Sequence, residues 1–439
     1  YILDVLNAYF QRYQSGVILD FEGLAKKDME NAFIKLGTGS MGGKARGIAF
    51  MNTMIAKAFL SEKYEDIKVK VPRSFVVCSD VFEKFIADNG MYEFIAQTSD
   101  EAEIARHFLT GELPPVIQEN LRVLTQCIKT PLAVRSSSIL EDSRVLPFAG
   151  IYKTYIVPNS HEDPQVRLRQ LADAVKLVYA SVFYESPVKY AKNADIRIEE
   201  EKMAVLIQEL VGDRFGDLYY PVISGVAQSY NYYPYYPMLP EEGTISLALG
   251  FGKVIVDGEQ VYRYCPAHPK MNPMISSATE YLKKSQRTFY ALDLVESAAA
   301  QMQIDDNCNY RQLPISRAHK DGVLEYVGST YSADNDYIDD NIHLPGPKVA
   351  TFAPILKYNR LPLTEIVKDF LRLGQQSFGA HVEIEFAVNL PKDPSKPKEF
   401  YFLQIRPMVA GKEAIQIEME IVKELWCASD RTIGNGVYQ

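Results

Sequence analysis

The sequence has 439 residues, of which 47% are hydrophobic and 23% are charged. These proportions are typical of folded globular proteins and exclude a mainly disordered chain, and 25 glycines and 24 prolines without a triplet period exclude a collagen-like one. With 47 Lys and Arg against 56 Asp and Glu, the net charge is −9, so we expect no nucleic-acid binding through overall charge, although a local basic site remains possible.

Both ends of the chain are predicted to be helical. Apolar residues between Ile2 and Tyr13 recur at helical spacing without a preceding capping residue, so residues 1–35 are interpreted as a helical lead-in that continues from a missing N-terminal region. Residues 413–439 are interpreted as a helix and a linker toward a missing C-terminal domain. The alternative is that both ends are simply frayed.

Between these ends, helices and strands are mixed. Strands occur in clusters rather than in strict alternation with helices, which favours an α+β architecture over a single doubly wound sheet. The run MAVLIQELV at 203–211 is almost entirely apolar and is predicted to be a buried central strand. In chain order, helices are predicted at 45–59, 79–89, 101–128 (split at Pro114 and Pro115), 167–184, near 279–300 and near 363–378, and strands on both sides of Pro72 within 69–78, at 132–135, at 152–157, in several segments up to residue 265, at 381–388 and at 400–406.

The first candidate for chemistry is the glycine-rich segment LGTGSMGGKARG at 36–47. Glycines let backbone N–H groups approach a phosphate, a helix N-terminus favours negative charge, and Lys44 would add a positive charge. No clear strand precedes the segment and no βαβ unit follows, which weakens the dinucleotide-binding interpretation, and Gly43 and Ala45 break the Walker pattern. The alternative is a flexible turn that caps the helix.

The second candidate is the segment AVRSSSILEDSRVLPFAG at 133–150. Arg135 stands at the end of a predicted strand, where arginine can bind a phosphate through two hydrogen bonds, and the serines that follow can add further donors. The alternative is a polar loop in which Arg135 pairs with Glu141 or Asp142.

The third candidate is a pair of strands, HVEIEFAV at 381–388 and FYFLQIRP at 400–407. Side chains alternate along a strand, so a hairpin would present two carboxylates, an amide and a guanidinium on one face. Carboxylate and amide oxygens suit Mg²⁺, which also binds phosphate oxygens. The alternative is a solvated face with a Glu–Arg cross-strand pair. The four residues on this face are Glu383, Glu385, Gln404 and Arg406.

Other patterns carry less information. The six histidines show no zinc-binding spacing, and no nucleophile elbow is present. The glycine-rich segment 247–259 is interpreted as a strand–turn–strand, and the tyrosine-rich segment 229–237 as a packed surface loop. Five cysteines without a CxxC motif favour reduced thiols and a cytoplasmic location, and no signal peptide or membrane span is expected.

Taken together, these segments resemble the nucleotide-binding domain of the phosphoenolpyruvate synthase and pyruvate phosphate dikinase family. The resemblance covers roughly residues 36–410, and the RSSS–ED–FAG and QIRP blocks are its most specific parts. The matching segments, in order, are GGKARG, VPRSFVV, AVRSSSILEDS–FAGIYKTY, MAVLIQELV, ISGVAQS, LALGFGKVIVDGE, VEIEFAV and YFLQIRP.

The resemblance implies an ATP-grasp fold, in which two subdomains, here 36–202 and 203–412, close on ATP and Mg²⁺. It implies catalytic contacts to the phosphates, adenine contacts at the end of the apolar strand, and metal ligands on the hairpin. Carried onto this sequence, the phosphate contacts are Lys44, Arg135 and Arg406, the adenine contacts are Gln208 and Val211, and the metal ligands are Glu383, Glu385 and Gln404, which also belongs to the phosphate end.

Some residues depart from the family pattern. Glu383 stands where an aspartate is usual, Ser138 replaces an alanine, and Gln228 lies near a usual Phe-Thr pair. A Thr-x-His-Ala-like motif, which marks the phosphate-accepting histidine in the family, is absent from this sequence.

The resemblance therefore implies a phosphotransferase unit that passes phosphate from Mg-ATP to a histidine on a separate swivelling domain, and finally to pyruvate. The implied partners are the phosphohistidine and pyruvate-binding domains of the same full-length protein. The alternatives are a relative that phosphorylates another acceptor, such as a glucan or an antibiotic, and a non-catalytic nucleotide sensor. The oligomeric state stays open.

Overall fold

The computed structural model describes residues 18–21, 33–58, 60–64, 66–138, 150–193, 197–271, 277–295, 304–305, 307–391, 393 and 395–408. The predicted C-terminal helix lies outside these ranges, as does most of the predicted helical lead-in. The part of the lead-in that is described forms strands instead, so the helical prediction is wrong there. These strands are β1 (Ile18–Asp20) and β2 (Phe33–Leu36).

The first of two large sheets has the strand order β1-β2-β4-β7-β5-β6. β1, β2 and β4 are parallel, whereas β7, β5 and β6 each run antiparallel to their neighbours. As predicted, the apolar run at 203–211 forms a buried strand in the middle of a sheet. The remaining strands are β4 (Ser74–Val77), β5 (Leu132–Ser137), β6 (Thr154–Val157) and β7 (Ala204–Glu209).

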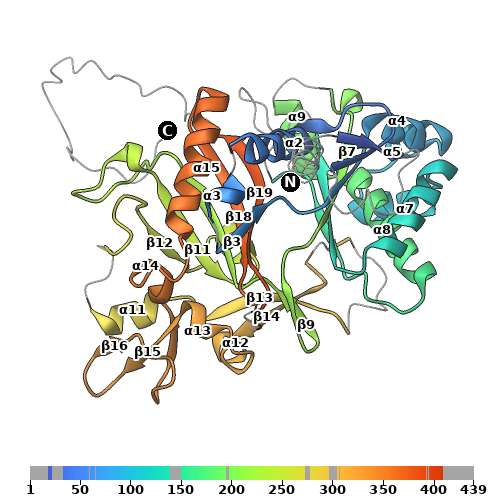
Figure 1. The fold of residues 1–439 in the computed structure, drawn as a ribbon. Coiled ribbons are helices and arrows are strands. Elements are labelled where there is room, and N and C mark those ends of the chain that lie inside the picture. The colour runs from blue at the N-terminus through green and yellow to red at the C-terminus, as the bar shows by residue number, and fades with distance from the viewer. Residues whose placement is uncertain are drawn as a thin grey trace, which may run out of the picture.

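Helices cover both faces of this sheet, which explains why its strands lack a polar face. Consecutive residues of β7, such as Val205 and Leu206, belong to different hydrophobic clusters on the two faces. One face packs on α2, and the other on a group of helices on the right of Figure 1. These elements are α2 (Gly42–Lys57), α4 (Ser79–Asp88), α5 (Met91–Ile95), α6 (Glu101–Thr110), α7 (Pro115–Cys127), α8 (Pro164–Ser181) and α9 (Glu185–Asn193).

The second large sheet has the strand order β12-β11-β10-β18-β19-β3. Helix α15 (Leu363–Phe378) packs on it, and Phe370 stacks on Phe400 and Phe402 with ring centroids 5.4 and 5.0 Å apart. Helix α2 contacts strands of both sheets and lies between them in Figure 1. The strands are β3 (Ile67–Lys70), β10 (Ile223–Gln228), β11 (Thr244–Leu249), β12 (Tyr262–Tyr264), β18 (Val382–Asn389) and β19 (Lys398–Pro407).

Two small sheets and several short helices complete the described structure. None of its helices has the length and apolar composition that a membrane crossing requires. The first small sheet contains β8 (Asp213–Phe215), β9 (Leu218–Tyr220), β13 (Thr288–Asp293) and β14 (Tyr310–Pro314). The second contains β15 (Gly328–Ser332), β16 (Tyr337–Asp339) and β17 (Lys348–Ala350). The short helices are α3 (Leu60–Lys63), α10 (Lys253–Val256), α11 (Ala278–Lys284), α12 (Ile315–Lys320), α13 (Leu324–Val327) and α14 (Ala353–Leu356).

The α+β class is confirmed, but several local predictions are wrong. The helix predicted near 279–300 ends at Lys284, and TFYALD at 288–293 forms β13, in keeping with its β-branched and aromatic residues. The segment 247–259 is not a strand–turn–strand, because β11 is followed by the short helix α10.

The sheets also divide the chain differently from the expected boundary at residues 202 and 203. Strand β7 belongs to the first sheet, so the expected boundary would assign this strand to the wrong half of the chain. Strand β3, from the first half of the sequence, is an edge strand of the second sheet. A strand does precede the glycine-rich segment, since β2 leads into α2 and lies parallel to β4.

The start of α2 lies directly against the end of β5. Gly43 donates its N–H to the carbonyl of Ser138 at 2.9 Å. Gly42 has a φ of +73°, and a Cβ atom there would lie 1.5 Å from the carbonyl oxygen of Ser137. Only glycine therefore fits at position 42.

We predict that Gly42→Ala lowers the free energy of unfolding by more than ~3 kcal/mol, because backbone strain and a clash with main-chain atoms add together. Gly258→Ala is the matched control, since Gly258 has a φ of +71° with no atom within 4 Å of the added Cβ. It should cost only about 1–2 kcal/mol. Urea denaturation followed by circular dichroism measures both values, and equal losses would contradict the prediction.

Candidate functional site

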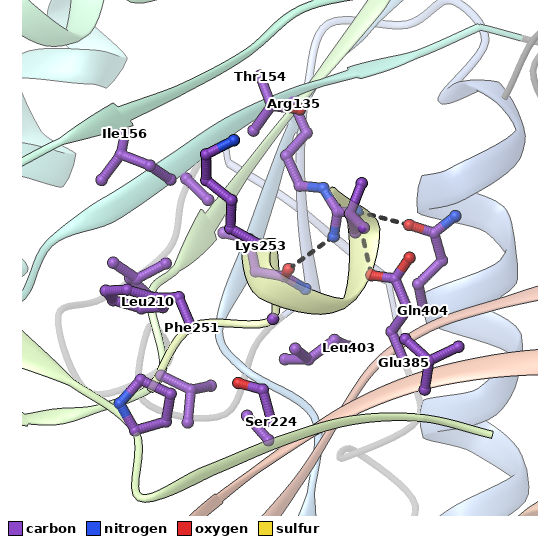
Figure 2. A pocket seen from close by; sticks show the side chains of 18 of the residues that line it. Arg135, Thr154, Ile156, Leu210, Ser224, Phe251, Lys253, Glu385, Leu403 and Gln404 are labelled. Atoms are coloured by element: carbon purple, nitrogen blue, oxygen red, sulfur yellow. Dashed lines mark hydrogen bonds and ion pairs between the residues drawn. The ribbon is translucent and has the colours of Figure 1, made fainter. Parts of the chain in front are cut away.

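A cavity of about 550 Å³ lies between the two large sheets. Its walls come from β5, β6 and β7 of the first sheet, and from β10, β18, β19 and α10 on the side of the second (Figure 2). Seven of the eight residues expected at an ATP site line this cavity, although they come from four distant parts of the sequence. They are Lys44, Arg135, Gln208, Val211, Glu385, Gln404 and Arg406, whereas Glu383 is not among the lining residues.

Arg135 is the side chain that connects the two sheets across the cavity. From β5 it donates a hydrogen bond from Nη2 to Oε1 of Gln404 at 2.5 Å, and the same Nη2 lies 3.7 Å from Oε2 of Glu385. Its Nη1 donates to Oε1 of Gln208 at 3.4 Å. Figure 2 shows the contacts of Arg135 with Gln404 and Glu385 as dashed lines. The alternative partners Glu141 and Asp142 lie outside the described residues.

The predicted hairpin of β18 and β19 is confirmed. The strands are antiparallel, with Glu383 opposite Arg406 and Glu385 opposite Gln404, and a register shift follows Glu385. The four polar side chains therefore share a face of the sheet, as their alternation in the sequence predicts.

The two glutamates of this face have different surroundings. Glu385 lines the cavity with a side chain that is 30% exposed. Oε1 of Glu383 accepts hydrogen bonds from Nε of Arg406 at 2.8 Å and from Nη2 of the same residue. Oε2 of Glu383 accepts from Nε2 of Gln228 at 2.7 Å. Both oxygens of Glu383 are thus engaged by protein donors, and its expected role as a metal ligand stays a prediction.

The glycine-rich segment is held by other parts of the protein. The N–H groups of Thr38 and Gly39 donate to the carboxylate of Asp80, both at 2.9 Å. The N–H of Ala45 donates to Oγ of Ser137 at 3.1 Å. These amides are thus engaged by protein acceptors, which does not match the expectation that the loop backbone cradles a phosphate.

Lys44 is the part of this segment that reaches the cavity. The residue is 8% exposed, and its Nζ donates to Oγ of Ser136 at 3.1 Å. The contacts of the neighbouring amides fix the first turn of α2 against β5, and they therefore fix the position from which the lysine projects.

The cavity has a polar and an apolar side. In Figure 2, Arg135, Glu385 and Gln404 lie together on one side, and Ile156, Leu210 and Phe251 lie on the other. The side chain of Gln208, expected near an adenine, instead bonds to Arg135 and donates from Nε2 to Oγ of Ser74 at 3.4 Å. The residues that follow it, 209–211, line the cavity. Ala133, Val211 and Leu403 add to the apolar lining.

Two further basic residues, Lys153 and Lys253, line the cavity and were not predicted from the sequence. Lys253 forms an ion pair with Asp257 at 2.7 Å, and its Nζ lies 5.4 Å from the ring centroid of Tyr290. The segment Gly-Phe-Gly-Lys at 250–253 could have indicated this position, because it repeats the combination of glycines and a lysine before a helix.

Positive charge predominates among the lining residues. All three acidic ones are paired: Glu209 with Arg73 at 2.7 Å, Asp257 with Lys253 at 2.7 Å, and Glu385 more loosely with Arg135 at 3.7 Å. Burial raises the pKa of Glu209, but hydrogen bonds from Arg73 and Thr130 lower it more, so its pKa lies below the usual range. The lining contains the basic residues Lys44, Arg135, Lys153, Lys253 and Arg406 and the acidic residues Glu209, Asp257 and Glu385.

A divalent cation fits only one part of this site. Within the described ranges, no group of three or more His, Cys, Asp or Glu residues is arranged to hold a metal. Mg²⁺, however, is commonly held by one or two carboxylates together with water and phosphate oxygens. Glu385 and the amide oxygen of Gln404, which lie opposite each other on β18 and β19, form such a donor set.

A family model and several known proteins are similar in sequence to this chain. Residues 38–424 match the family model described as pyruvate phosphate dikinase, AMP/ATP-binding domain. A phosphoenolpyruvate synthase of Aeropyrum pernix is 24% identical over 370 residues, which cover 77% of this chain and 38% of that protein. The chain thus spans well under half the length of this relative.

Two further relatives have other names. The uncharacterized phosphotransferase YvkC of Bacillus subtilis is 28% identical over 192 residues, covering 43% of this chain and 20% of that protein. The rifampicin phosphotransferase of Streptomyces sviceus is 24% identical over 210 residues, covering 43% of this chain and 22% of that protein.

We predict that Asp80→Ala lowers the free energy of unfolding by ~1–3 kcal/mol at pH 7, because two backbone amides lose a charged acceptor. Burial raises the pKa of Asp80, but the donors of Thr38 and Gly39 lower it more, so its pKa lies below the ordinary 3.8. A lowered pKa means that this stabilisation is complete above pH 4 and is lost as the pH falls further.

Urea denaturation of the wild type and the variant between pH 7 and pH 3 tests this prediction. The difference between their free energies of unfolding should become smaller below pH 4. Asp88→Ala is the control, because Asp88 lies on the same helix in an exposed pair with Lys84 and should cost less than ~1 kcal/mol. A difference that stays constant with pH would contradict the assignment to the Asp80 carboxylate.

Proposed function

This chain belongs to the pyruvate phosphate dikinase AMP/ATP-binding domain family, and we propose that its cavity binds Mg-ATP and performs the first phosphoryl transfer of a dikinase-type enzyme. The observation that carries the proposal is the contact of Arg135, on the first sheet, with Gln404 and Glu385, on the second. We further propose that the two sheets are the two lobes of an ATP-grasp fold, closing on the nucleotide between them.

The size and the lining residues of the cavity suit a nucleoside triphosphate. Its volume of about 550 Å³ lies within the ~300–1,000 Å³ of small-molecule sites. The apolar side, with Ile156, Leu210 and Phe251, would take the base. Val211, which follows β7 at the cavity wall, is placed to add a backbone contact to it.

The basic side chains would act on the phosphates. Phosphoryl transfer asks a protein mainly to position the reactants and to stabilise charge on the transferred group. Lys44, Arg135 and Arg406 all line the cavity, and each offers N–H donors to phosphate oxygens. The two arginines come from opposite sheets, so closure of the sheets would bring them onto the same phosphate group.

Glu385 and Gln404 would hold Mg²⁺, which would neutralise phosphate charge when bound. Without it, Glu385 lies near Arg135 and Gln404 accepts a hydrogen bond from the same guanidinium. Both residues would therefore exchange an arginine contact for a new one when the nucleotide enters.

The acceptor is proposed to be a histidine on a separate domain of the full-length protein, which would then pass the phosphate to pyruvate. The name of the Aeropyrum relative supports pyruvate chemistry, and its greater length supports further domains. A second candidate is transfer to a different final acceptor, which the named rifampicin phosphotransferase supports. A pure nucleotide sensor would bind ATP without any transfer.

We predict that the chain binds Mg-ATP in a calorimetric titration and that Arg135→Ala weakens binding by at least tenfold, since one charge-assisted contact is worth ~1.5–3 kcal/mol. Arg122→Ala is the control, because Arg122 pairs with Glu119 on the exposed face of α7, and it should bind as the wild type does. No heat at millimolar Mg-ATP would contradict the proposed function.

In the full-length protein, we expect Glu385→Ala to abolish phosphohistidine formation from ATP, because the cavity loses the carboxylate proposed to hold Mg²⁺. Acid-labile, base-stable incorporation of ³²P from γ- and β-labelled ATP measures this step. Glu365→Ala, which removes an exposed carboxylate of α15 paired with Lys368, should leave labelling unchanged. Normal labelling of the Glu385 variant would remove that residue from the site.

A further inference from the structure

A row of three polar side chains crosses the second sheet beside the cavity. Gln228 on β10 lies directly opposite Glu383 on β18, and Glu383 lies directly opposite Arg406 on β19. The three residues therefore occupy neighbouring strands at one level of the sheet and on one face of it. Arg406 lines the cavity, whereas Gln228 and Glu383 do not.

The contacts along this row are directional. Nε2 of Gln228 donates to Oε2 of Glu383 at 2.7 Å. Oε1 of Glu383 accepts from Nε of Arg406 at 2.8 Å and also from its Nη2. The Glu383 side chain is 12% exposed and that of Arg406 is 36% exposed. The carboxylate is thus enclosed between two donors, and the arginine extends toward solvent and the cavity.

The next polar row of the sheet differs at one position. Here Val226 on β10 lies opposite Glu385, and Glu385 lies opposite Gln404. Valine offers no side-chain donor, so Glu385 receives no hydrogen bond from β10 comparable to the one that Gln228 gives Glu383. The two glutamates share a strand and a face, but their neighbours on β10 give them different surroundings.

We propose that Glu383 and Gln228 are positioning residues that hold the Arg406 guanidinium in the cavity, and that Glu383 is not a metal ligand. Gln228 fixes the carboxylate of Glu383, and this carboxylate fixes two N–H groups of Arg406. Because the guanidinium is planar and rigid, fixing Nε and Nη2 also fixes the directions of its other N–H groups. This inference rests on the proposed function, since it assigns Arg406 to the phosphates.

Metal ligation by Glu383 would require the opposite arrangement. Three of its roughly four acceptor sites are occupied, so a metal would have to share Oε2 with Gln228 or displace a donor, and an enclosed charged group that loses its partner is costly. Glu385 needs no such exchange beyond its 3.7 Å contact with Arg135. The geometry therefore favours arginine positioning as the role of Glu383 and cation binding as the role of Glu385.

The test is ATP affinity by calorimetry, measured once in EDTA and once in excess Mg²⁺, for Glu383→Gln, Gln228→Leu and Glu385→Gln. Glu383→Gln should weaken binding ~10–100-fold in both buffers, because a charge-assisted hydrogen bond to Arg406 is lost with or without the metal. Gln228→Leu should weaken it about three- to tenfold in both, as expected for one neutral donor. Glu385→Gln should weaken binding only in Mg²⁺.

Controls separate positioning from a general structural loss. Glu383→Asp keeps the carboxylate and should restore most of the affinity lost in Glu383→Gln. Gln312→Leu removes a glutamine whose Nε2 bonds to Thr288 at an exposed position of β14, and it should bind ATP normally. Adding Arg406→Lys to Glu383→Gln should cause a smaller loss than Arg406→Lys causes in the wild type, because the two changes share the Glu383–Arg406 contact.

Loss of affinity confined to Mg²⁺ in Glu383→Gln would overturn the proposal and return Glu383 to the metal. Unchanged ATP affinity of Gln228→Leu in both buffers would show that Gln228 does not position Arg406. If Glu383→Gln fails to fold, Gln228→Leu still decides the outcome, because its effect must be equal in EDTA and Mg²⁺. Absence of ATP binding by the wild type would instead refute the proposed function itself.

Discussion

Arg135 is the constraint on which the rest of the site depends. It stands on β5 of the first sheet, its side chain is only 15% exposed, and its partners Gln404 and Glu385 belong to the second sheet. A largely enclosed cation needs acceptors, and here Gln208 supplies one from the same sheet while Gln404 and Glu385 supply the others from the opposite wall of the cavity. The distance between the two sheets therefore determines whether Arg135 can contact Gln404 and Glu385 across the cavity. A triphosphate would offer the same guanidinium more charge than one carboxylate and one amide do, so its entry would preserve the link between the sheets rather than break it.

Helix α2 places the second cation relative to Arg135. It contacts strands of both sheets, and its first turn is fixed against Ser137 and Ser138 through the amides of Ala45 and Gly43. The loop before it is fixed to α4 through Asp80. Because these contacts consume backbone amides, the glycines serve the close approach of the helix to β5 and leave the lysine side chain to reach the cavity. The serines after Arg135 have a similar purpose: Ser136 bonds to Lys44, and Ser138 donates to the buried Glu201 at 2.7 Å.

The parts of this structure that follow from local patterns could be predicted from the sequence. Helix α15 occupies the range that its apolar periodicity indicates, and the hairpin follows from alternation on two strands. Strand partners beyond a hairpin are not encoded locally. Nothing in the sequence near β7 indicates that it lies between β4 and β5, and nothing near β3 indicates that it pairs with β19, some 330 residues later. For the same reason the engagement of the loop amides by Asp80, about 40 residues away, could not be foreseen.

The two glutamates of β18 show that distant strand pairing, which the local sequence does not encode, also affects the candidate site. Alternation predicts that Glu383 and Glu385 share a face, and the hairpin places Arg406 and Gln404 opposite them. The neighbour on the other side is β10, about 150 residues earlier, which places Gln228 beside one glutamate and Val226 beside the other. One amide donor in place of an isopropyl group gives Glu383 a third hydrogen bond, in addition to the two from Arg406. It encloses Glu383 as the partner of Arg406, while the carboxylate of Glu385 lines the cavity. Identical side chains two residues apart thus acquire different tasks from a strand that neither the motif nor its spacing contains.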